Sequence, residues 1–450
     1  MILSKFREGV LVSHIEPLPK VLAERLRLRA DAFGIPGLAI VLVSAGRHSI
    51  WVHGEDAPGS GQNVTEQTWF SVASVGKHVT ALAVLDLSQR GLVDLDAPIG
   101  RYLTDIPLAW ANRSILSLLR HTSGLPEYLS YTDADDVPDR RDEFMRVYAA
   151  LQPLWDEGQA WMYSNTNYIL LGFLIAQMSG VSYGEALHQI FKSFGCTGVA
   201  VSSPAWAREA NAKGSCATAI DESSLKRQVI GDGDISFTSE GAAAWLGLIL
   251  GDKALDEHHR SVMFSAATMK SGRPSPYGCA WFVDPLGETP ICHHAGHFDG
   301  WTAMAYVVPS MGCAALVMCN LAPGNTRAVR FLTQMALEGF VPGSTPLALD
   351  LKFDDAPDLT SVARSQLLRQ GAVDASYFSE EMTRVAERGG PVRNVINLWS
   401  GQEPQIFGLI ESHEHPTHVF RRYRVSYPER IEHLLVGTTT TGQICWAWPL

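Results

Sequence analysis

Two groups of strand-like segments, separated by a long helical stretch, constrain the fold of this chain most strongly. The segments are Gly37–Val43 and His48–His53 on one side, and Tyr277–Val283, Trp301–Val308 and Cys313–Asn320 on the other. Helical patterns dominate from about residue 74 to residue 250. Strands from both ends of a sequence can share a sheet if the helices between them fold as an insertion. We therefore predict an α+β fold, in which an antiparallel sheet is flanked by helices and carries an inserted all-helical domain.

A Gly/Ser/Thr/Pro segment, Gly343–Pro346, predicts a linker between two domains. The predicted boundaries are residues 1–342 for the first domain, with its sheet in 1–73 and 256–342 and its helices in 74–255, and residues 343–450 for the second. The second part contains two helical patterns and four strand-like runs, which predict a small α+β accessory domain. It carries no recognisable chemical motif. Its role is left open between a lid, a dimer contact and a passive domain.

Composition excludes several kinds of partner. The formal charge of −11, without long acidic runs, argues against nucleic acid and anionic membrane. The seven cysteines include no Cys-x-x-Cys pair, so we expect reduced thiols and neither a metal nor another cofactor. The N-terminal residues lack a signal-peptide core, and no apolar stretch is long enough to span a bilayer. We therefore expect a cytoplasmic protein, and a homodimer is left open.

Ser74 and Lys77 lie three residues apart, at the predicted start of a helix that continues into the apolar run Ala81–Leu87. These positions share one helix face, so the amine can reach the hydroxyl. The unpaired amides of a helix start also favour an oxyanion. A serine with an adjacent lysine is a known arrangement for acyl transfer. The pattern is common, and Ser223 and Lys226 repeat it in a polar stretch; the context favours Ser74 as the candidate nucleophile.

A second candidate segment, Tyr163-Ser164-Asn165, directly precedes a strongly apolar helical pattern. A tyrosine beside a lysine amine can act as a general base if nearby positive charge keeps its phenol partly ionised. Asn165 can offer its amide to a substrate carbonyl. Taken alone, the segment is explained more simply by a buried aromatic residue and a helix N-cap.

A third candidate segment, His294-Ala295-Gly296-His297, lies where a strand is expected. A glycine on a strand permits close approach of another backbone, here that of a substrate. His294 could hydrogen-bond the tyrosine or the leaving group, in either its neutral or its charged form. A metal site at His293, His294 and His297 is not predicted, because no carboxylate or further histidine follows at a fixed spacing.

Six segments in order resemble the serine hydrolases related to class C β-lactamases, D-alanyl-D-alanine carboxypeptidases, D-aminopeptidases and β-lactamase-like esterases. They are Phe70–Ala81, Leu118–Pro126, Tyr163–Gly172, Gly231–Ile235, Tyr277–Phe282 and His294–Trp301. Each segment is a weak match alone, and the six in family order are a strong one. The resemblance covers residues 17 to 340. It implies that this part of the chain has the fold of the family, beside the α+β class predicted from the strands.

The resemblance implies a role for each candidate residue. Ser74 would be the acylated nucleophile, and Lys77 and Tyr163 would share the general-base and general-acid work. Asn165 would contact the acyl-side amide of the substrate. The backbone amides of Ser74 and His297 would form the oxyanion hole, and Gly296, next to His297 on the same predicted strand, would contact the substrate. The segment 121–124 would be a structural loop.

One departure from the family narrows the expected substrate. His294 stands where β-lactamases usually carry a lysine, which removes a permanent cation for a free substrate carboxylate. This lowers the expectation of β-lactam hydrolysis or carboxypeptidase action, and Gly231–Ile235 with Gly300-Trp301 looks most like D-aminopeptidases. We expect a hydrolase of amides or esters in a small-molecule or peptide substrate, most like a D-aminopeptidase, amidase or esterase. The alternatives are an acyltransferase or peptide cyclase, and a non-catalytic binding or sensor protein of the same fold.

Overall fold

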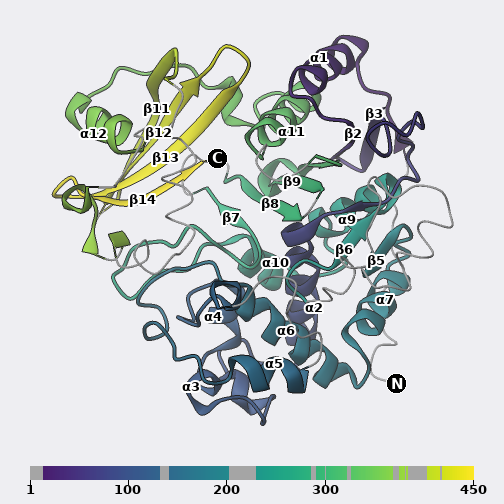
Figure 1. Ribbon diagram of the computed structural model, residues 1–450, viewed down its shortest axis with the longest axis vertical. Helices are drawn as coiled ribbons and strands as arrows, with labels where there is room; N and C mark the ends of the chain where they lie inside the picture. Colours follow the sequence, from purple (N-terminus) through teal and green to yellow (C-terminus); the bar gives the residue numbers. More distant parts are fainter. Residues whose placement is uncertain are drawn as a thin grey trace.

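A seven-stranded sheet forms the centre of the computed structural model (Figure 1). The structure describes residues 14–131, 141–201, 230–284, 290–298, 300–321, 326–367, 374–380, 382–383, 403–415 and 418–449. The strands are β1 (His14–Ile15), β2 (Gly37–Ser44), β3 (Arg47–Gly54), β7 (Phe282–Val283), β8 (Cys292–Phe298), β9 (Trp301–Val308) and β10 (Cys313–Cys319). Their order is β1-β3-β2-β10-β9-β8-β7, and every neighbouring pair is antiparallel except β1 with β3. Because β2 pairs with β10, the two groups of predicted strands form one sheet, which confirms the α+β class.

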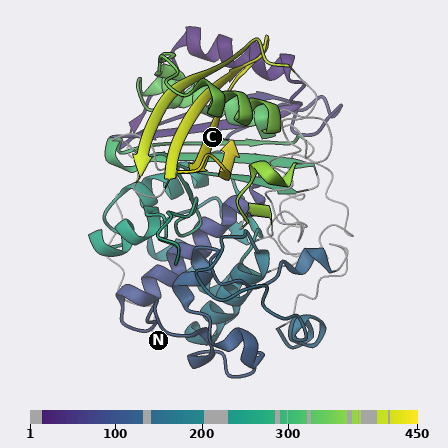
Figure 2. The ribbon, with the colours of Figure 1, turned by 90° about the vertical axis from the view of Figure 1, so that its left-hand side faces the viewer.

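The central strands are buried on both faces, because helices cover each side of the sheet (Figure 2). Along β2, Leu38, Ile40 and Leu42 pack towards α1 (Lys20–Ala32) and α11 (Thr326–Phe340). The alternate residues of the same strand join the apolar core of the helical part. This alternation follows from the two-residue period of a strand, with both faces apolar.

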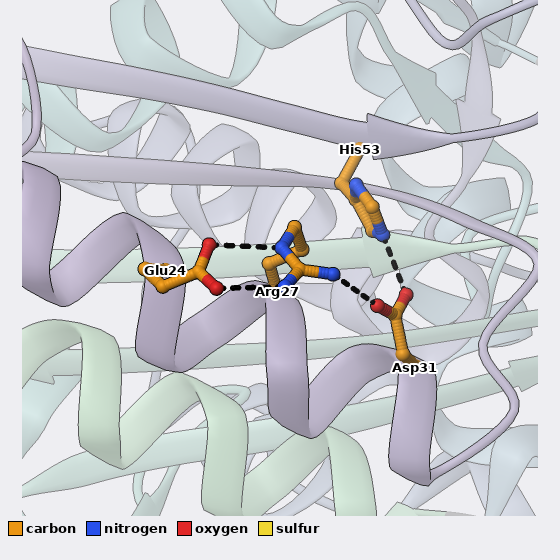
Figure 3. Close-up of polar contacts among 4 residues, drawn as sticks. All are labelled: Glu24, Arg27, Asp31 and His53. Atoms are coloured by element: carbon orange, nitrogen blue, oxygen red, sulfur yellow. Dashed lines mark hydrogen bonds and ion pairs between the residues drawn. The ribbon is translucent and has the colours of Figure 1, made fainter.

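The outer helix α1 is joined to β3 by a cluster of exposed charges (Figure 3). Arg27 donates hydrogen bonds to Glu24 and Asp31, and Asp31 Oδ1 lies 2.8 Å from His53 Nε2. Exposed pairs of this kind contribute little to stability. The buried face of α1, which includes Leu26, supplies the larger share, since burying one leucine contributes roughly 1.5–3 kcal/mol.

Eight helices between β4 and β7 in the chain form the helical part below the sheet. They are α2 (Lys77–Gln89), α3 (Leu108–Ala111), α4 (Ile115–Leu119), α5 (Arg141–Tyr148), α6 (Asn165–Ser179), α7 (Tyr183–Ser193), α9 (Ser239–Leu250) and α10 (Glu257–Phe264), counted in the described ranges. Helices α2 and α6 are largely buried and pack against each other at its centre. The left-handed Gly180 (φ 72°) ends α6, as its sequence predicts. None of the described helices is by itself long and apolar enough to cross a membrane.

The predicted strand Tyr277–Val283 is mostly a tight turn, so this prediction was wrong for all but its last two residues. Gly278 N donates to Trp281 O at 2.8 Å, and Tyr277 forms a bridge with Phe282. Ala280 lies in the left-handed region (φ 69°), which reverses the chain. The residues are all buried, so their apolar pattern does not distinguish a strand from a buried turn.

The C-terminal part is a four-stranded antiparallel sheet with its own apolar cluster. Its elements are α12 (Pro357–Leu367), β11 (Ile406–His415), β12 (His418–Ser426), β13 (Ile431–Thr439) and β14 (Ile444–Pro449), which confirm the strand-like runs. Arg422 forms a buried ion pair with Asp284, directly after β7, and this contact docks the sheet beside the main one. Half of the second predicted helix, residues 377–388, lies outside the described residues.

Candidate active site

Ser74 lies in a 3₁₀ turn, Ala73–Gly76, directly before α2. The chain enters this turn from a small sheet of β4 (Phe70–Ser71), β6 (Ile235–Phe237) and β5 (Val199–Val201), in the order β4-β6-β5. Val72 N donates to Ile235 O at 3.0 Å, which holds the turn against the first residue of β6. Ala73 adopts φ 46°, a conformation uncommon for a residue with a side chain. The turn is therefore held by its surroundings, with Ser74 half-buried at the helix start.

The amine of Lys77 reaches Ser74, as the three-residue spacing predicts. Lys77 Nζ lies 3.0 Å from Ser74 Oγ and also donates to the backbone oxygen of Asp232. The Lys77 side chain is fully buried. Burial lowers the pKa of its ammonium to about 8, although the carboxyl groups of Asp232, Glu127 and Asp234 act in the opposite direction. A lysine with this pKa can take a proton from the serine at a pH near neutral.

Three carboxyl groups lie around this lysine. Burial is the main cause that raises the pKa of Asp232 to about 6, of Glu127 to about 7 and of Asp234 to about 8. Tyr128 donates its hydroxyl hydrogen to Asp232 Oδ2 at 3.2 Å. Asp232 and Asp234 belong to one segment of the family resemblance, and Glu127 lies outside all six segments. The paired aspartates of Gly231–Ile235 were a signal for Asp232 and Asp234, whereas no spacing distinguishes Glu127.

Tyr163 lies at the same lysine, from a segment distant in sequence. Lys77 Nζ is 5.1 Å from the centre of the Tyr163 ring. Burial raises the pKa of the Tyr163 phenol well above its usual value, and the neighbouring Ser74 side chain only partly offsets this. Its hydroxyl makes no hydrogen bond of standard geometry within the described ranges. The Tyr163 phenol therefore stays protonated near neutral pH, whereas a tyrosinate base requires a partly ionised phenol. Lys77 is the better candidate base.

Asn165 is the first residue of α6 and is held by Glu127. Its backbone N–H donates to Glu127 Oε2 at 2.5 Å, and its side-chain Nδ2 lies 3.4 Å from Oε1. A carboxylate at this position satisfies a free amide of the helix start and complements the helix dipole. The side chain is half-buried, so a contact with a substrate amide stays a prediction.

His294 is buried on β8 and uses both ring nitrogens within the protein. Its Nδ1 lies 2.6 Å from Ala295 O, and its Nε2 lies 2.9 Å from the hydroxyl of Tyr277. Because a carbonyl only accepts, Nδ1 carries the hydrogen and Nε2 accepts from Tyr277. Burial lowers the pKa of His294 to about 3, which leaves the ring neutral. The tyrosine partner is thus Tyr277, and the Tyr163 ring lies 5.9 Å away between ring centres.

Gly296 brings β8 against the turn that carries Ser74 (Figure 1). A Cβ atom at Gly296 would lie 2.0 Å from Val72 O and 3.2 Å from Ser74 N, so only glycine fits. The close backbone is therefore that of the protein, at a glycine for which the approach of a substrate backbone was predicted. The approach places the strand that carries His297 beside the Ser74 amide. The His297 side chain itself is exposed, with its Nε2 3.0 Å from Thr326 Oγ1.

The structure thus brings Ser74, Lys77 and Tyr163 together, with His294 behind Tyr163 and β8 beside the nucleophile turn. The second Ser-x-x-Lys pair, residues 223–226, and Asp299 lie outside the described residues. Within the described part of the chain, no group of three or more histidine, cysteine, aspartate or glutamate side chains is arranged to hold a metal ion. The arrangement suits nucleophilic catalysis by an activated serine.

Comparisons with known proteins agree with this geometry. Penicillin-binding protein 4* of Bacillus subtilis is 26% identical over 258 residues, which are 52% of this chain and 57% of that protein. The chain thus spans about half the length of this relative. The structure of a D-amino acid amidase from Ochrobactrum anthropi has a TM-score of 0.57 at 20% identity, and the match covers 72% of this chain and 99% of that one.

A second solved structure also matches the C-terminal part. The octameric penicillin-binding protein homologue from Pyrococcus abyssi has a TM-score of 0.61 at 15% identity, over 92% of this chain and 95% of that chain. At these identities, both structures show that the fold is shared. The family model described as Beta-lactamase matches residues 22–339, which contain every candidate catalytic residue. This chain therefore belongs to the beta-lactamase family of serine hydrolases.

Proposed function

We propose that this protein is a hydrolase that forms an acyl-enzyme at Ser74 on an amide or ester substrate. The observation that carries the proposal is the 3.0 Å contact between Ser74 Oγ and the buried amine of Lys77, with its lowered pKa. A desolvated lysine beside a serine removes the hydroxyl proton as the nucleophile attacks. The membership of the chain in a family of serine hydrolases supports the same chemistry.

The proposed reaction has two halves. The Ser74 oxygen bonds to the substrate carbonyl carbon as its proton passes to Lys77. The bond to the leaving nitrogen or oxygen then breaks, and the leaving group takes a proton from the Tyr163 hydroxyl, which Lys77 replaces. Water attacks the resulting ester by the reverse proton path, which releases the acid and restores Ser74. The backbone amides of Ser74 and His297 are the proposed donors to the oxyanion.

The charges of the site support a substrate whose acyl group carries no carboxylate. His294, in the position of the family's lysine, is neutral and has both nitrogens occupied. Three carboxyl groups lie around Lys77, and one of them, Asp232, has a pKa of about 6. These groups disfavour an anionic acyl group and favour a neutral or amine-bearing one. An amino acid amide or a related ester fits, which agrees with the shared fold of the D-amino acid amidase.

The test combines labelling and substrate selection. We expect a fluorophosphonate to label Ser74 by mass spectrometry, and a p-nitrophenyl ester to give a burst that Ser74→Ala abolishes. Ser223→Ala is the matched control, because it removes the serine of the second Ser-x-x-Lys pair. A Ser74→Ala variant with full activity would refute the nucleophile. In a panel of D- and L-amino acid amides, esters and nitrocefin, preference for nitrocefin would contradict the substrate class.

A further inference from the structure

His121 holds the segment that carries Tyr163 from both sides. Its backbone oxygen accepts a hydrogen bond from Met162 N at 3.0 Å, and its ring Nδ1 accepts one from Ser164 N at 3.2 Å. These two bonds bracket Tyr163 in the chain. The rings of His121 and Tyr163 are also in contact, with their centres 4.4 Å apart. The backbone and the ring of Tyr163 are thus both restrained by one residue.

The neighbours of His121 also determine which ring nitrogen carries the hydrogen. Ser164 N–H can only donate, and Asn167 Nδ2 lies 3.0 Å from the same Nδ1. Asn167 is oriented in turn by Ser123, whose hydroxyl donates to Asn167 Oδ1 at 2.7 Å. Nδ1 is therefore the acceptor and Nε2 carries the hydrogen. Burial lowers the pKa of His121 well below its usual value, so the acceptor persists over the working pH range.

Two features of His121 destabilise the folded protein and would not be expected of a residue with only a packing role. Its backbone adopts φ 57°, the left-handed region that few residues with side chains occupy. Its Nε2 is buried without a hydrogen-bond partner among the described residues. The ring lies among Tyr163 and two further tyrosines, Tyr168 and Tyr277, whose ring centres are 5.1 and 4.7 Å away. Costs of this kind concentrate at functional sites, which distinguishes His121 from a residue of an ordinary loop.

We propose that His121 is a positioning residue for acylation, which acts by holding the Tyr163 hydroxyl at Ser74 and Lys77. The inference rests on the proposed function and adds a role to a loop that the family resemblance treats as structural. A small displacement of a proton-transfer group lowers the rate of the chemical step more than it lowers binding. The effect is therefore expected in the acylation rate, with little change in KM.

The test uses His121→Leu, which removes the acceptor, and His121→Asn, whose Oδ1 can replace Nδ1 and which tolerates the left-handed backbone. On an amino acid p-nitroanilide, whose leaving nitrogen must take a proton, we expect the leucine variant to acylate roughly 100-fold more slowly, with KM within about threefold of wild type. The asparagine variant should stay within about fivefold of wild type. Thermal unfolding of each variant measures any loss of stability separately.

A double-mutant cycle with Tyr163→Phe separates positioning from general damage. If His121 acts through Tyr163, His121→Leu should lower the acylation rate by less than about threefold when Tyr163 is already replaced by phenylalanine. Equal losses in both backgrounds, or a folded leucine variant that acylates within threefold of wild type, would overturn the inference. If His121→Leu does not fold, Asn167→Asp provides the second variant: it replaces a donor to Nδ1 by an acceptor, and unchanged acylation there would also overturn it. Failure of wild type to label at Ser74 would instead refute the proposed function.

Discussion

Two clusters of charged side chains in this molecule behave in opposite ways. On the surface, Glu24, Arg27, Asp31 and His53 join α1 to β3, and the hydrogen bond from Arg27 lowers the pKa of Glu24 (Figure 3). At the candidate active site, burial lowers the pKa of the Lys77 ammonium to about 8 and raises the pKa of nearby carboxyl groups. In the first cluster, partners in solvent stabilise the charged forms. In the second, loss of solvent stabilises the neutral forms.

The comparison teaches that burial, more than the number of charges, makes a group reactive. In the surface cluster, the hydrogen bond from Arg27 lowers the pKa of Glu24, so this carboxylate stays charged at neutral pH and has no proton to exchange. The members of the buried cluster have pKa values between about 6 and about 8. Groups in that range can both give and take protons under ordinary conditions.

The largest expected effect is the loss of activity on removal of the buried amine. Lys77→Met should lower the acylation rate by roughly 10²–10⁴-fold, because the serine loses its base. Lys226→Met, in the second Ser-x-x-Lys pair, is the matched control and should leave the rate unchanged. Burst kinetics with an activated ester measures both variants. A Lys77→Met variant that acylates as fast as Lys226→Met would show that the buried amine is not the base. Burial would then not explain reactivity at this site.

A second prediction concerns pH, and its sign follows from the lowered pKa of Lys77. Only the free amine accepts a proton, so the acylation rate should rise with pH and level off above about 8. Asp232→Asn removes a negative charge that stabilises the ammonium, so the midpoint should move to lower pH. The asparagine keeps an acceptor for Tyr128 and is therefore a conservative change. A midpoint that stays in place or moves upward would show that Asp232 does not act on this amine.

The smallest expected effect belongs to the surface cluster. Asp31→Asn should change the free energy of unfolding by less than about 1 kcal/mol, and it should not change acylation. The difference in the free energy of unfolding between the variant and wild type should be smaller still at 1 M salt, because exposed charges are screened. Urea unfolding at low and high salt measures this. If Asp31→Asn lowered the free energy of unfolding by more than about 2 kcal/mol at both salt concentrations, the surface charges would be as poorly solvated as the buried ones.

Local patterns in the sequence predicted the elements and one contact of the site. The spacing of Ser74 and Lys77 predicted their hydrogen bond, because residues three apart on a helix start share a face. Apolar runs predicted β9 and β10 close to their observed ends. The turn at Tyr277 was missed, because a buried strand and a buried turn have the same composition. The bond between Tyr277 and His294 was missed with it, since no local pattern indicates a partner 17 residues away.

The sequence by itself determined which serine is the candidate nucleophile, the lysine nearest to it, most of the strands, and the family that the order of the motifs indicates. Only the tertiary structure decided that Asp232, Glu127 and Asp234 surround Lys77, and that His121 brackets Tyr163. Short-range geometry is set by backbone dihedral angles, which neighbouring residues restrict directly. The pKa of a buried group depends instead on the solvent it loses and on charges brought close by folding, and neither is written at any one position of the chain.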